Sequence, residues 1–146
     1  MELIVKRFDG LTADELYDIL ALRSAVFVVE QRCPYLDIDG ADRRAIHVFF
    51  RDADGIQAYL RVLEAGVVSE EVSIGRVVAA RRRCGVGSRL LDAGIAAARE
   101  RLGARRIRIE AQSYAKPFYE ARGFKQVSEE FLEDGIPHMV MLLDIE

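Results

Sequence analysis

The sequence predicts a single α/β domain spanning residues 1–146, built on a mixed sheet with helices on both faces. Its 146 residues suffice for one hydrophobic core and fall short of two ordinary domains. Apolar runs typical of strands alternate with helical patterns in the order β-α-β-β-β-α-β-α-β-β. No repeat, linker or low-complexity tract interrupts this order, so the chain is expected to fold as one unit.

The N-terminal segment predicts a strand followed by a capped helix. Residues 3–8 have the composition of a strand and end at an Asp-Gly turn signal. Thr12 and Glu15 have the spacing of a capping box, so a helix is expected to begin after Thr12. The apolar spacing then carries the helix, with or without a break, to about residue 31. Its inward face is formed by Leu16, Ile19, Leu20, Arg23 and Phe27.

The segment 33–42 is predicted to be a loop, since it contains Pro34 and Gly40. Asp37, Asp39 and Asp42 suggest a calcium-binding loop. The EF-hand pattern fails, however, because it requires a glutamate at its twelfth position and a helix on each side. The sequence therefore favours a surface loop in which these carboxylates bond to nearby backbone amides.

The remaining chain predicts the rest of the sheet and two more helices. Strands over 45–51 and 56–64 flank an Asp-Ala-Asp-Gly hairpin signal. A strand over 72–80 leads into a glycine turn, and a helix follows from Val86 to Leu102, ending at Gly103. The last predicted elements are a strand over 106–111, a short helix over 114–122 closed by Gly123, and strands over 124–130 and 138–144 split by a turn at 133–137.

The glycine turn Arg82-Arg83-Cys84-Gly85-Val86-Gly87 is a candidate anion site. The first amides of a helix lack internal partners and the helix dipole adds positive character there. Glycines at 85 and 87 permit turn dihedrals and a close backbone approach to a phosphate. A Walker A loop is excluded because the chain has no Gly-Lys pair, and a dinucleotide fingerprint lacks its third glycine. A plain turn with two glycines remains the structural alternative.

Composition narrows the function classes. The formal net charge of −3 argues against nucleic acid as the main partner, while arginines concentrated between Arg76 and Arg108 suit a small anionic ligand. The two cysteines show no metal spacing, so no metal is expected. With no membrane-length apolar run and no signal peptide, no membrane association is expected and the cytoplasm is the default location.

The element order and two motifs resemble the GNAT superfamily of N-acetyltransferases. The glycine turn is similar to the family's Arg-x-x-Gly-x-Gly pyrophosphate loop. The stretch 117–124 resembles its C-terminal Phe-Tyr-x-x-x-Gly-Phe element. The stretches 22–35, 37–42, 75–77 and 133–138 resemble the ElaA-like branch. The resemblance covers nearly the whole chain. It departs in one place, because the segment between Gly75-Arg76-Val77 and the glycine pair is shorter than expected for this branch.

The resemblance implies acetyl-CoA as acyl donor and an amine as acceptor. Backbone groups of the central strand would bind pantetheine, and amides of the glycine turn would hold the pyrophosphate. The implied cofactor-binding residues are Val77, Val78, Ala79, Arg82, Arg83, Cys84, Gly85, Val86, Gly87, Ser88 and Phe118.

The resemblance also assigns Tyr119 as the acid that protonates the departing thiolate, with a core tyrosine as the alternative. The general base stays open among Glu70, Glu71, Glu110, His47 and His138, or water. Glu70 and Glu71 could instead be loop acids, Glu110 could pair with an arginine, and His47 could face outward. Arg76 interrupts an apolar strand and is expected to contact substrate or to pair with an acid such as Glu30.

Two other functions are compatible with the same loop. A non-catalytic acyl-CoA-binding module would keep the glycine turn without needing Tyr119 or an open acceptor cleft. An acyl-homoserine-lactone synthase shares the related fold, although this chain is short for that role. Neither the acceptor amine nor the oligomeric state, a homodimer included, follows from the sequence.

Overall fold

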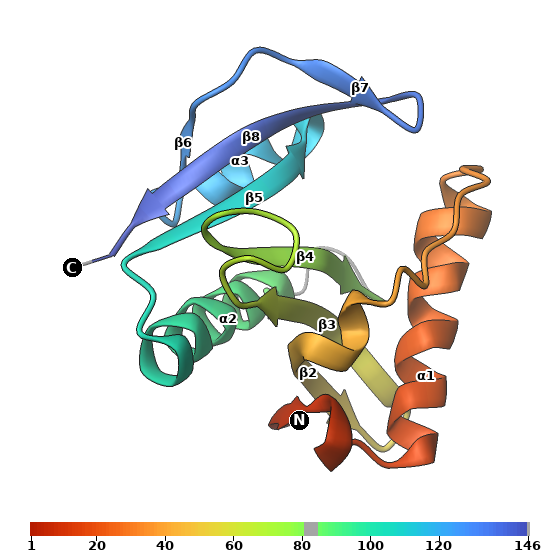
Figure 1. Cartoon of the computed structure of the whole chain (residues 1–146). Helices are drawn as coiled ribbons and strands as arrows, with labels where there is room; N and C mark the ends of the chain where they lie inside the picture. The colour runs from red at the N-terminus through yellow and green to blue at the C-terminus, as the bar shows by residue number, and fades with distance from the viewer. Residues whose placement is uncertain (81–84, 146) are drawn as a thin grey trace.

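The computed structural model describes residues 1–80 and 85–145, which form a mixed sheet flanked by helices (Figure 1). The strands follow the order β1-β2-β3-β4-β5-β8-β6, and β7 also pairs with β8. The strands are β1 (Glu2–Arg7), β2 (Ala45–Asp52), β3 (Gly55–Leu63), β4 (Val72–Ala79), β5 (Arg106–Gln112), β6 (Lys125–Gln126), β7 (Phe131–Glu133) and β8 (Ile136–Asp144).

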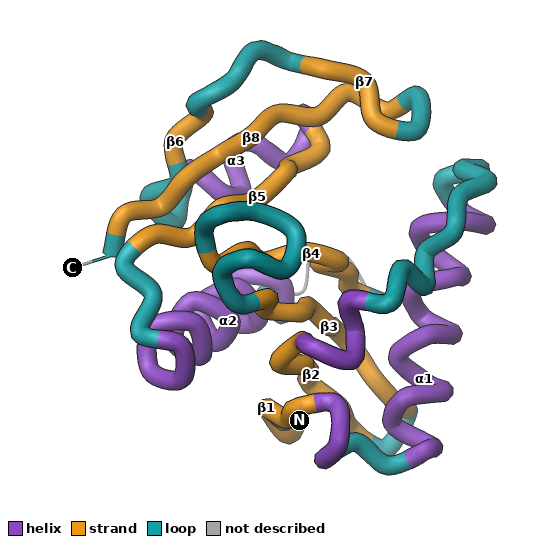
Figure 2. Tube along the Cα trace, in the orientation of Figure 1, coloured by secondary structure: helices purple, strands orange, loops and turns teal. Residues whose placement is uncertain are grey.

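Three α-helices and four shorter helical segments connect these strands (Figure 2). The α-helices are α1 (Ala13–Arg23), α2 (Val86–Leu102) and α3 (Lys116–Glu120). A π-helical segment, η2 (Ser24–Glu30), continues α1, and 3-10 turns occupy η1 (Phe8–Gly10), η3 (Ala41–Arg44) and η4 (Ser113–Ala115). In the part of the chain that the structure describes, no helix is both long and apolar enough to cross a membrane.

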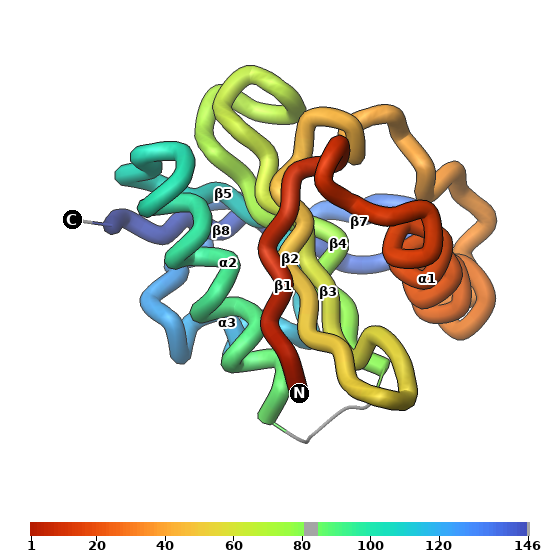
Figure 3. Tube along the Cα trace, turned by 90° about the horizontal axis from the view of Figure 1, so that it is seen from below, coloured from red at the N-terminus to blue at the C-terminus, as the bar shows by residue number. Residues whose placement is uncertain are grey.

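The helices α1 and α2 cover opposite faces of the sheet (Figure 3). The larger core cluster joins α2 residues such as Leu90 and Leu91 to Val48 and Leu60 of the sheet. On the other face, Ile19 of α1 packs with Phe49 and other buried residues. The predicted mixed sheet with helices on both faces is therefore confirmed.

The first helix begins as the sequence predicts and ends in an unusual way. Thr12 and Glu15 form the capping box: the Glu15 amide donates to Thr12 Oγ1 at 3.0 Å, and the Thr12 amide donates to Glu15 Oε1 at 2.9 Å. The predicted continuation to about residue 31 is confirmed, because the chain stays helical through η2. The Gln31 amide there donates to the Val26 carbonyl at 3.1 Å, a spacing of five residues. Such wide turns are rare in proteins, and those that do occur often lie at functional sites.

Glycines define both ends of α2. Gly85 precedes the helix with φ +78°, a left-handed conformation in which glycine has no Cβ penalty. Gly103 ends it with φ +62°, and its amide donates to carbonyls of the last turn, as predicted. The helix therefore occupies the residues that the periodicity indicates.

The last strands differ from the prediction. The expected strand over 124–130 is wrong for most of its length, because only Lys125–Gln126 pairs with β8 there. The ladder is interrupted where the Val140 amide donates to Ser128 Oγ at 2.9 Å. Pairing resumes in the hairpin β7–β8, whose turn residues Asp134 and Gly135 both have positive φ. The predicted turn therefore shrinks to two residues.

Candidate active site

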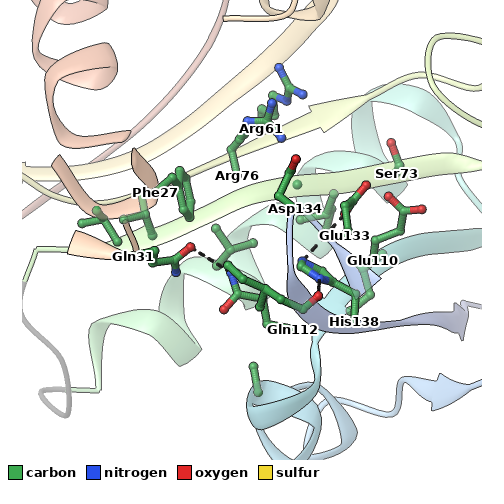
Figure 4. Close-up of a pocket in the computed structure, with 18 of the residues that line it drawn as sticks. Phe27, Gln31, Arg61, Ser73, Arg76, Glu110, Gln112, Glu133, Asp134 and His138 are labelled. Carbon is green, nitrogen blue, oxygen red and sulfur yellow. Dashed lines mark hydrogen bonds and ion pairs between the residues drawn. The ribbon is translucent and has the colours of Figure 1, made fainter. Parts of the chain in front are cut away.

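The strands β4 and β5 separate after a short parallel contact. They pair only at Val72–Ile107 and Ser73–Arg108, after which β4 runs toward α2 and β5 toward α3. Side chains from both strands, from η2 and its following loop, from α3 and from the β7–β8 hairpin line a cleft of about 460 Å³ (Figure 4). The end where the strands still pair is here called the closed end of the cleft.

A β-bulge at Arg76 shapes one wall of this cleft. Tyr59 pairs with Val78 and Arg61 with Gly75, so β4 has one more residue than β3 between the two pairs. Arg76 has φ +51°, a left-handed conformation that is costly for a residue with a Cβ. Bulges re-aim side chains and bend strands next to active sites. Here the bulge lies where β4 has parted from β5.

A network of three arginines and three aspartates, four of them buried, supports this wall. Arg23 of α1 is fully buried. It donates to Asp37 Oδ2 at 2.8 Å and to Asp42 Oδ1 at 2.7 Å. Arg61 of β3 donates to Asp39 Oδ2 at 2.6 Å and to Asp42 Oδ1 at 3.0 Å. The members of this Arg–Asp network are Arg23, Arg61, Arg76, Asp37, Asp39 and Asp42.

The network corrects one part of the prediction for 33–42: residues 33–40 form a loop with exposed residues such as Leu36 and Ile38, but its carboxylates do not bond only to nearby amides. Asp37 and Asp42 are buried, and their carboxylates pair with arginines that lie far away in the sequence. Asp39 Oδ1 accepts the nearby Ala41 amide at 3.0 Å, as predicted, whereas the local bond of Asp37 Oδ1 comes from the Tyr35 hydroxyl at 3.1 Å. Because a buried guanidinium requires counter-charge, the arginines of α1, β3 and β4 hold this loop against the sheet.

Arg76 is held by acids of the same loop. Its Nε lies 2.8 Å from Asp37 Oδ1, and its Nη2 lies 3.4 Å from Asp39 Oδ2. The guanidinium carbon also lies 5.6 Å from the centre of the Tyr35 ring, within cation–π range. Of the two predicted roles for Arg76, the structure shows pairing with acids, and it identifies them as Asp37 and Asp39.

Tyr119 of α3 lies between the core and the cleft. Its ring packs edge-on against Phe118 and Phe124, with centroid distances of 5.1 and 5.8 Å. Tyr119 also lines the cleft. Burial, with a smaller effect from Tyr114, raises the pKa of the Tyr119 hydroxyl above its ordinary value. The residue therefore keeps its proton at physiological pH.

The residues assigned to the donor lie along β4 and at the start of α2. Val77, Val78 and Ala79 line the cleft. A Cβ added to Gly87 would lie 3.6 Å from the Phe118 ring, so these two residues are neighbours. The other assigned residues near α2 are Gly85, Val86 and Ser88, at its N-terminus, while Arg82, Arg83 and Cys84 lie outside the described residues.

Only two of the five base candidates line the cleft, Glu110 and His138. Glu70 and Glu71 are not among its lining residues. The expectation that His47 faces outward is wrong: the ring is fully buried. Its Nδ1 lies 2.7 Å from the Tyr59 hydroxyl, and its Nε2 lies 2.9 Å from the Asp42 carbonyl oxygen. Burial lowers the pKa of His47, which suits a neutral structural imidazole.

The cleft brings His138 and Glu110 together with Glu133, one of the acids at 129–134 for which the sequence is compatible with either a cationic acceptor or a solvated loop. His138 Nδ1 lies 2.7 Å from the Ile136 carbonyl oxygen, and its Nε2 lies 3.7 Å from Glu133 Oε2. Glu110 Oε1 lies 3.4 Å from Nη2 of Arg108. Because side chains alternate between the two faces along paired strands, Glu110 of β5 and His138 of β8 lie on the same face of the sheet. The position of Glu133 depends on the register of the β7–β8 hairpin, which could not be predicted from the sequence.

Two further contacts tie together the walls of the cleft. Gln112 Nε2 donates to Gln31 Oε1 at 3.2 Å, which links β5 to the end of η2 (Figure 4). Cys33 Sγ lies 3.5 Å from the Asp134 carbonyl oxygen, which links the loop after η2 to the β7–β8 turn. Among the described residues, no group of His, Cys, Asp and Glu has an arrangement suited to a metal ion.

Comparison with known proteins agrees with this architecture. Residues 26–145 match the family described as Acetyltransferase (GNAT) domain. Escherichia coli ElaA is 37% identical over 139 residues, which cover 92% of this chain and 91% of ElaA. The crystal structure of E. coli ElaA superposes with a TM-score of 0.91, at 36% identity, covering 98% of this chain and 99% of that one.

Two other solved structures extend the comparison. An acyl-CoA N-acyltransferase from Pseudomonas aeruginosa has a TM-score of 0.91 at 36% identity, covering 98% of this chain and 99% of its own. The CoA-dependent acyl-homoserine lactone synthase BjaI has a TM-score of 0.80 at 14% identity, covering 99% and 83%, and shares the fold alone. The family match and the ElaA relative together show that this chain belongs to the GNAT acetyltransferase family, in its ElaA-like branch.

Proposed function

We propose that this protein transfers an acetyl group from acetyl-CoA to an amine. The observation that carries the proposal is the separation of β4 from β5. Because only Val72 and Ser73 pair with β5, the rest of β4 has no strand beside it on that side. An extended ligand that contains amides can use such an edge as another strand would. Pantetheine has two amides, and the Val77–Ala79 segment of this edge lines the cleft.

The start of α2 supports a phosphate group at the other end of the same ligand. Gly85 occupies the N-cap position and provides no capping side chain. The amides of Val86, Gly87 and Ser88 are first-turn donors, which have no acceptor within their own helix. Together with the helix dipole, they favour the diphosphate of acetyl-CoA.

Tyr119 is proposed to complete the reaction. The acceptor nitrogen forms a bond to the thioester carbonyl carbon, the carbon–sulfur bond breaks, and the sulfur leaves as a thiolate. The Tyr119 hydroxyl donates its proton to this thiolate and recovers one from the nitrogen as the amide forms. Burial raises the pKa of Tyr119, so the hydroxyl carries a proton at physiological pH, and the same shift means that it gives up this proton only when the thiolate charge develops beside it.

His138 is the proposed proton acceptor for the incoming amine. The Ile136 carbonyl oxygen can only accept a hydrogen bond, so His138 Nδ1 carries a proton. In the neutral ring, Nε2 therefore has the free lone pair, and it takes a proton from the ammonium form of the acceptor through an intervening water, since Glu133 Oε2 lies 3.7 Å from Nε2. The acceptor then attacks as a neutral amine.

The proposal is tested by binding and turnover measured together. At a hundredfold excess over its dissociation constant, acetyl-CoA should stabilise the protein by about 2.7 kcal/mol, which thermal unfolding detects. Release of CoA thiol should then depend on an added amine. A folded sample with no thermal shift in millimolar acetyl-CoA would contradict the proposal. Binding without amine-dependent thiol release, over a broad amine panel, would instead indicate a non-catalytic acyl-CoA-binding module.

A further inference from the structure

We infer, on the basis of the proposed function, that the acceptor has a second positive group and that Glu110 and Glu133 bind it at the closed end of the cleft. The acceptor class would thus be an amine with a distal cation, such as a diamine. Four features lead to this inference: the charge balance of the walls, the surroundings of Glu133, the burial of His138, and the place of the acids relative to Tyr119.

The arginines of the Arg–Asp network are not available to an anionic acceptor. Its three guanidinium groups pair with three carboxylates at 2.6 to 3.4 Å, which leaves the network as a whole without net charge. Among the described residues, the charged groups that remain in the cleft lining are Arg108, Glu110, Glu133 and Asp134, with His138. Acids therefore outnumber bases on the wall formed by β5, β7 and β8.

The two glutamates lack full compensation. Arg108 lies 3.4 Å from Glu110, whereas the nearest cationic candidate for Glu133 is the His138 ring at 3.7 Å. Burial, followed by the negative charge of Glu110, raises the pKa of the Glu133 carboxyl. Both effects mean that the ionised form of Glu133 is under-stabilised. A cation placed between these carboxylates would relieve the repulsion.

The surroundings of His138 fix its ring beside Glu133. The residue is 9% exposed, and its ring stacks on Phe131 with a centroid distance of 6.2 Å. Its Nδ1 is held by the Ile136 carbonyl oxygen at 2.7 Å, while its Nε2 lies 3.7 Å from Glu133 Oε2, which is longer than a hydrogen bond. Figure 4 shows the ring directed toward Glu133. The ring is therefore fixed beside Glu133 without a hydrogen bond to it, so the Glu133 carboxylate can still accept one from a ligand.

The glutamates suit a distal group better than the reacting nitrogen. Adjacent carboxylates would favour the ammonium form of that nitrogen and so oppose its attack. Glu110 lies two residues beyond Arg108, which pairs with Ser73 at the closed end. Figure 4 likewise shows Glu110 and Glu133 near Ser73, with Phe27 and Gln31 at the opposite side. The reacting nitrogen would then lie farther along the cleft, toward Tyr119.

The experiment compares acceptors that differ only in the charge of their distal end. Putrescine and cadaverine are assayed with acetyl-CoA beside the amino alcohols and the amino acids of the same chain lengths. We expect kcat/KM to fall from diamine to amino alcohol to amino acid, by about tenfold at the first step, since one charge-assisted contact contributes on the order of 1.4 kcal/mol. Equal use of the three classes, or preference for the amino acids, would overturn the inference.

Two variants locate the effect. Glu133→Gln and Glu110→Gln should each raise the KM for the diamine about tenfold while leaving that for the amino alcohol within about twofold. Glu129→Gln is the matched control, since it makes the same charge change at an exposed residue that is not among the cleft lining. A change of equal size for diamine and amino alcohol in the cleft variants would also contradict the inference.

The two proposals fail in different ways. If acetyl-CoA produces no thermal shift, the acetyltransferase proposal itself is wrong. If acetyl-CoA binds but the diamines are not acetylated, or are acetylated no faster than the amino alcohols, only the assignment of Glu110 and Glu133 is wrong.

Discussion

Tyr119 shows how one side chain can have both a packing and a chemical role. Its ring contacts Phe118 and Phe124, so α3 depends on it for its position. The same residue borders the cleft, where a hydroxyl can meet a ligand. The two alternatives that the sequence leaves open for this tyrosine are therefore compatible, and only a substitution that keeps the ring separates them.

Tyr119→Phe should lower turnover and leave the binding of acetyl-CoA nearly unchanged. The ring and its packing are retained, and only the proposed proton donor is lost. We expect kcat to fall by about ten- to ten-thousandfold, with the dissociation constant of acetyl-CoA within about twofold of wild type. Thiol release with a working amine measures the first quantity and calorimetry the second. An unchanged kcat, where chemistry limits the rate, would leave protonation to water.

Asp42→Asn should strongly destabilise the fold. Burial opposes ionisation of Asp42, but hydrogen bonds and charges of Arg23 and Arg61 outweigh it and lower the pKa of this carboxyl. Without its charge, two buried guanidinium groups lose a shared partner. We expect a loss of about 3 kcal/mol in the free energy of unfolding, measured with urea at pH 7. Asp18→Asn, at an exposed residue of α1, is the control and should stay within about 0.5 kcal/mol.

At the scale of elements, α2 lies so close to β3 at Gly94 that a side chain there would overlap with Leu60. A Cβ added to Gly94 would lie 2.8 Å from Leu60 Cδ2 and 2.9 Å from Leu60 Cδ1. Leu60 is fully buried in the main core cluster, so we expect its side chain to move aside only by displacing its core neighbours. Gly94 thus sets the distance between the helix that begins at the glycine turn and the sheet.

Gly94→Ala should therefore destabilise the protein, although alanine is the better helix former. The overpacking penalty is about 1–3 kcal/mol, against a gain in helix propensity of about 1 kcal/mol. The matched test repeats the substitution in a Leu60→Val background, where the two Cδ atoms are absent. There Gly94→Ala should become neutral or stabilising in urea unfolding. Equal destabilisation in both backgrounds would show that the clash is not with Leu60.

The elements that the sequence predicts well are those fixed by local chemistry. The capping box at Thr12 and the glycines at 85 and 103 set helix ends through contacts within a few residues, and each is found as expected. The Arg–Asp network was missed because its pairs join residues 14 to 39 positions apart. No local pattern encodes such pairs. The strand over 124–130 is shorter than predicted, because the side chain of Ser128 replaces a backbone partner of β8.

In the candidate site, too, some features could be predicted from the sequence, whereas others depend on contacts between distant residues. The placement of Val77–Ala79 beside the cleft agrees with what the resemblance to the GNAT family implies for the strand before the glycine turn. Tyr119 follows from its motif. The bulge at Arg76 and the approach of Glu133 to His138 depend on strand register, which a period-two pattern cannot fix for short polar strands.

The whole molecule should lose stability as the pH falls below about 5. Arg61 holds the pKa of the Asp39 carboxyl below its usual value. For Asp42 and Glu15 burial acts in the opposite direction but is outweighed, so their pKa values are also lowered. Because the unfolded chain binds protons more readily at these groups, their stabilisation is present above an unfolded pKa of about 4 and declines below it.

This pH dependence is measured by urea unfolding at pH values from 7 to 3. Glu133 acts in the opposite direction, since its raised pKa means that its protonation favours the folded state. Three carboxyls have lowered pKa values and one has a raised pKa, so we expect the free energy of unfolding to increase with pH over this range. The Asp42→Asn variant should show a shallower decline. A free energy of unfolding that stays constant down to pH 3 would contradict the assignment.

Because β4 and β5 pair at two positions, the rate of amide hydrogen–deuterium exchange should differ between the strands of the sheet. Backbone amides of β2 and β3 lie in strands that are paired on both sides, whereas the cleft side of β4 beyond Ser73 has no strand beside it. In the free protein, the β4 amides that point to that side should exchange faster than the amides of β2 and β3, because unpaired and exposed amides are less protected from exchange. A donor lying along this edge would slow them selectively. The pattern of slowed amides would then trace the path of the donor along β4 without any acceptor being known.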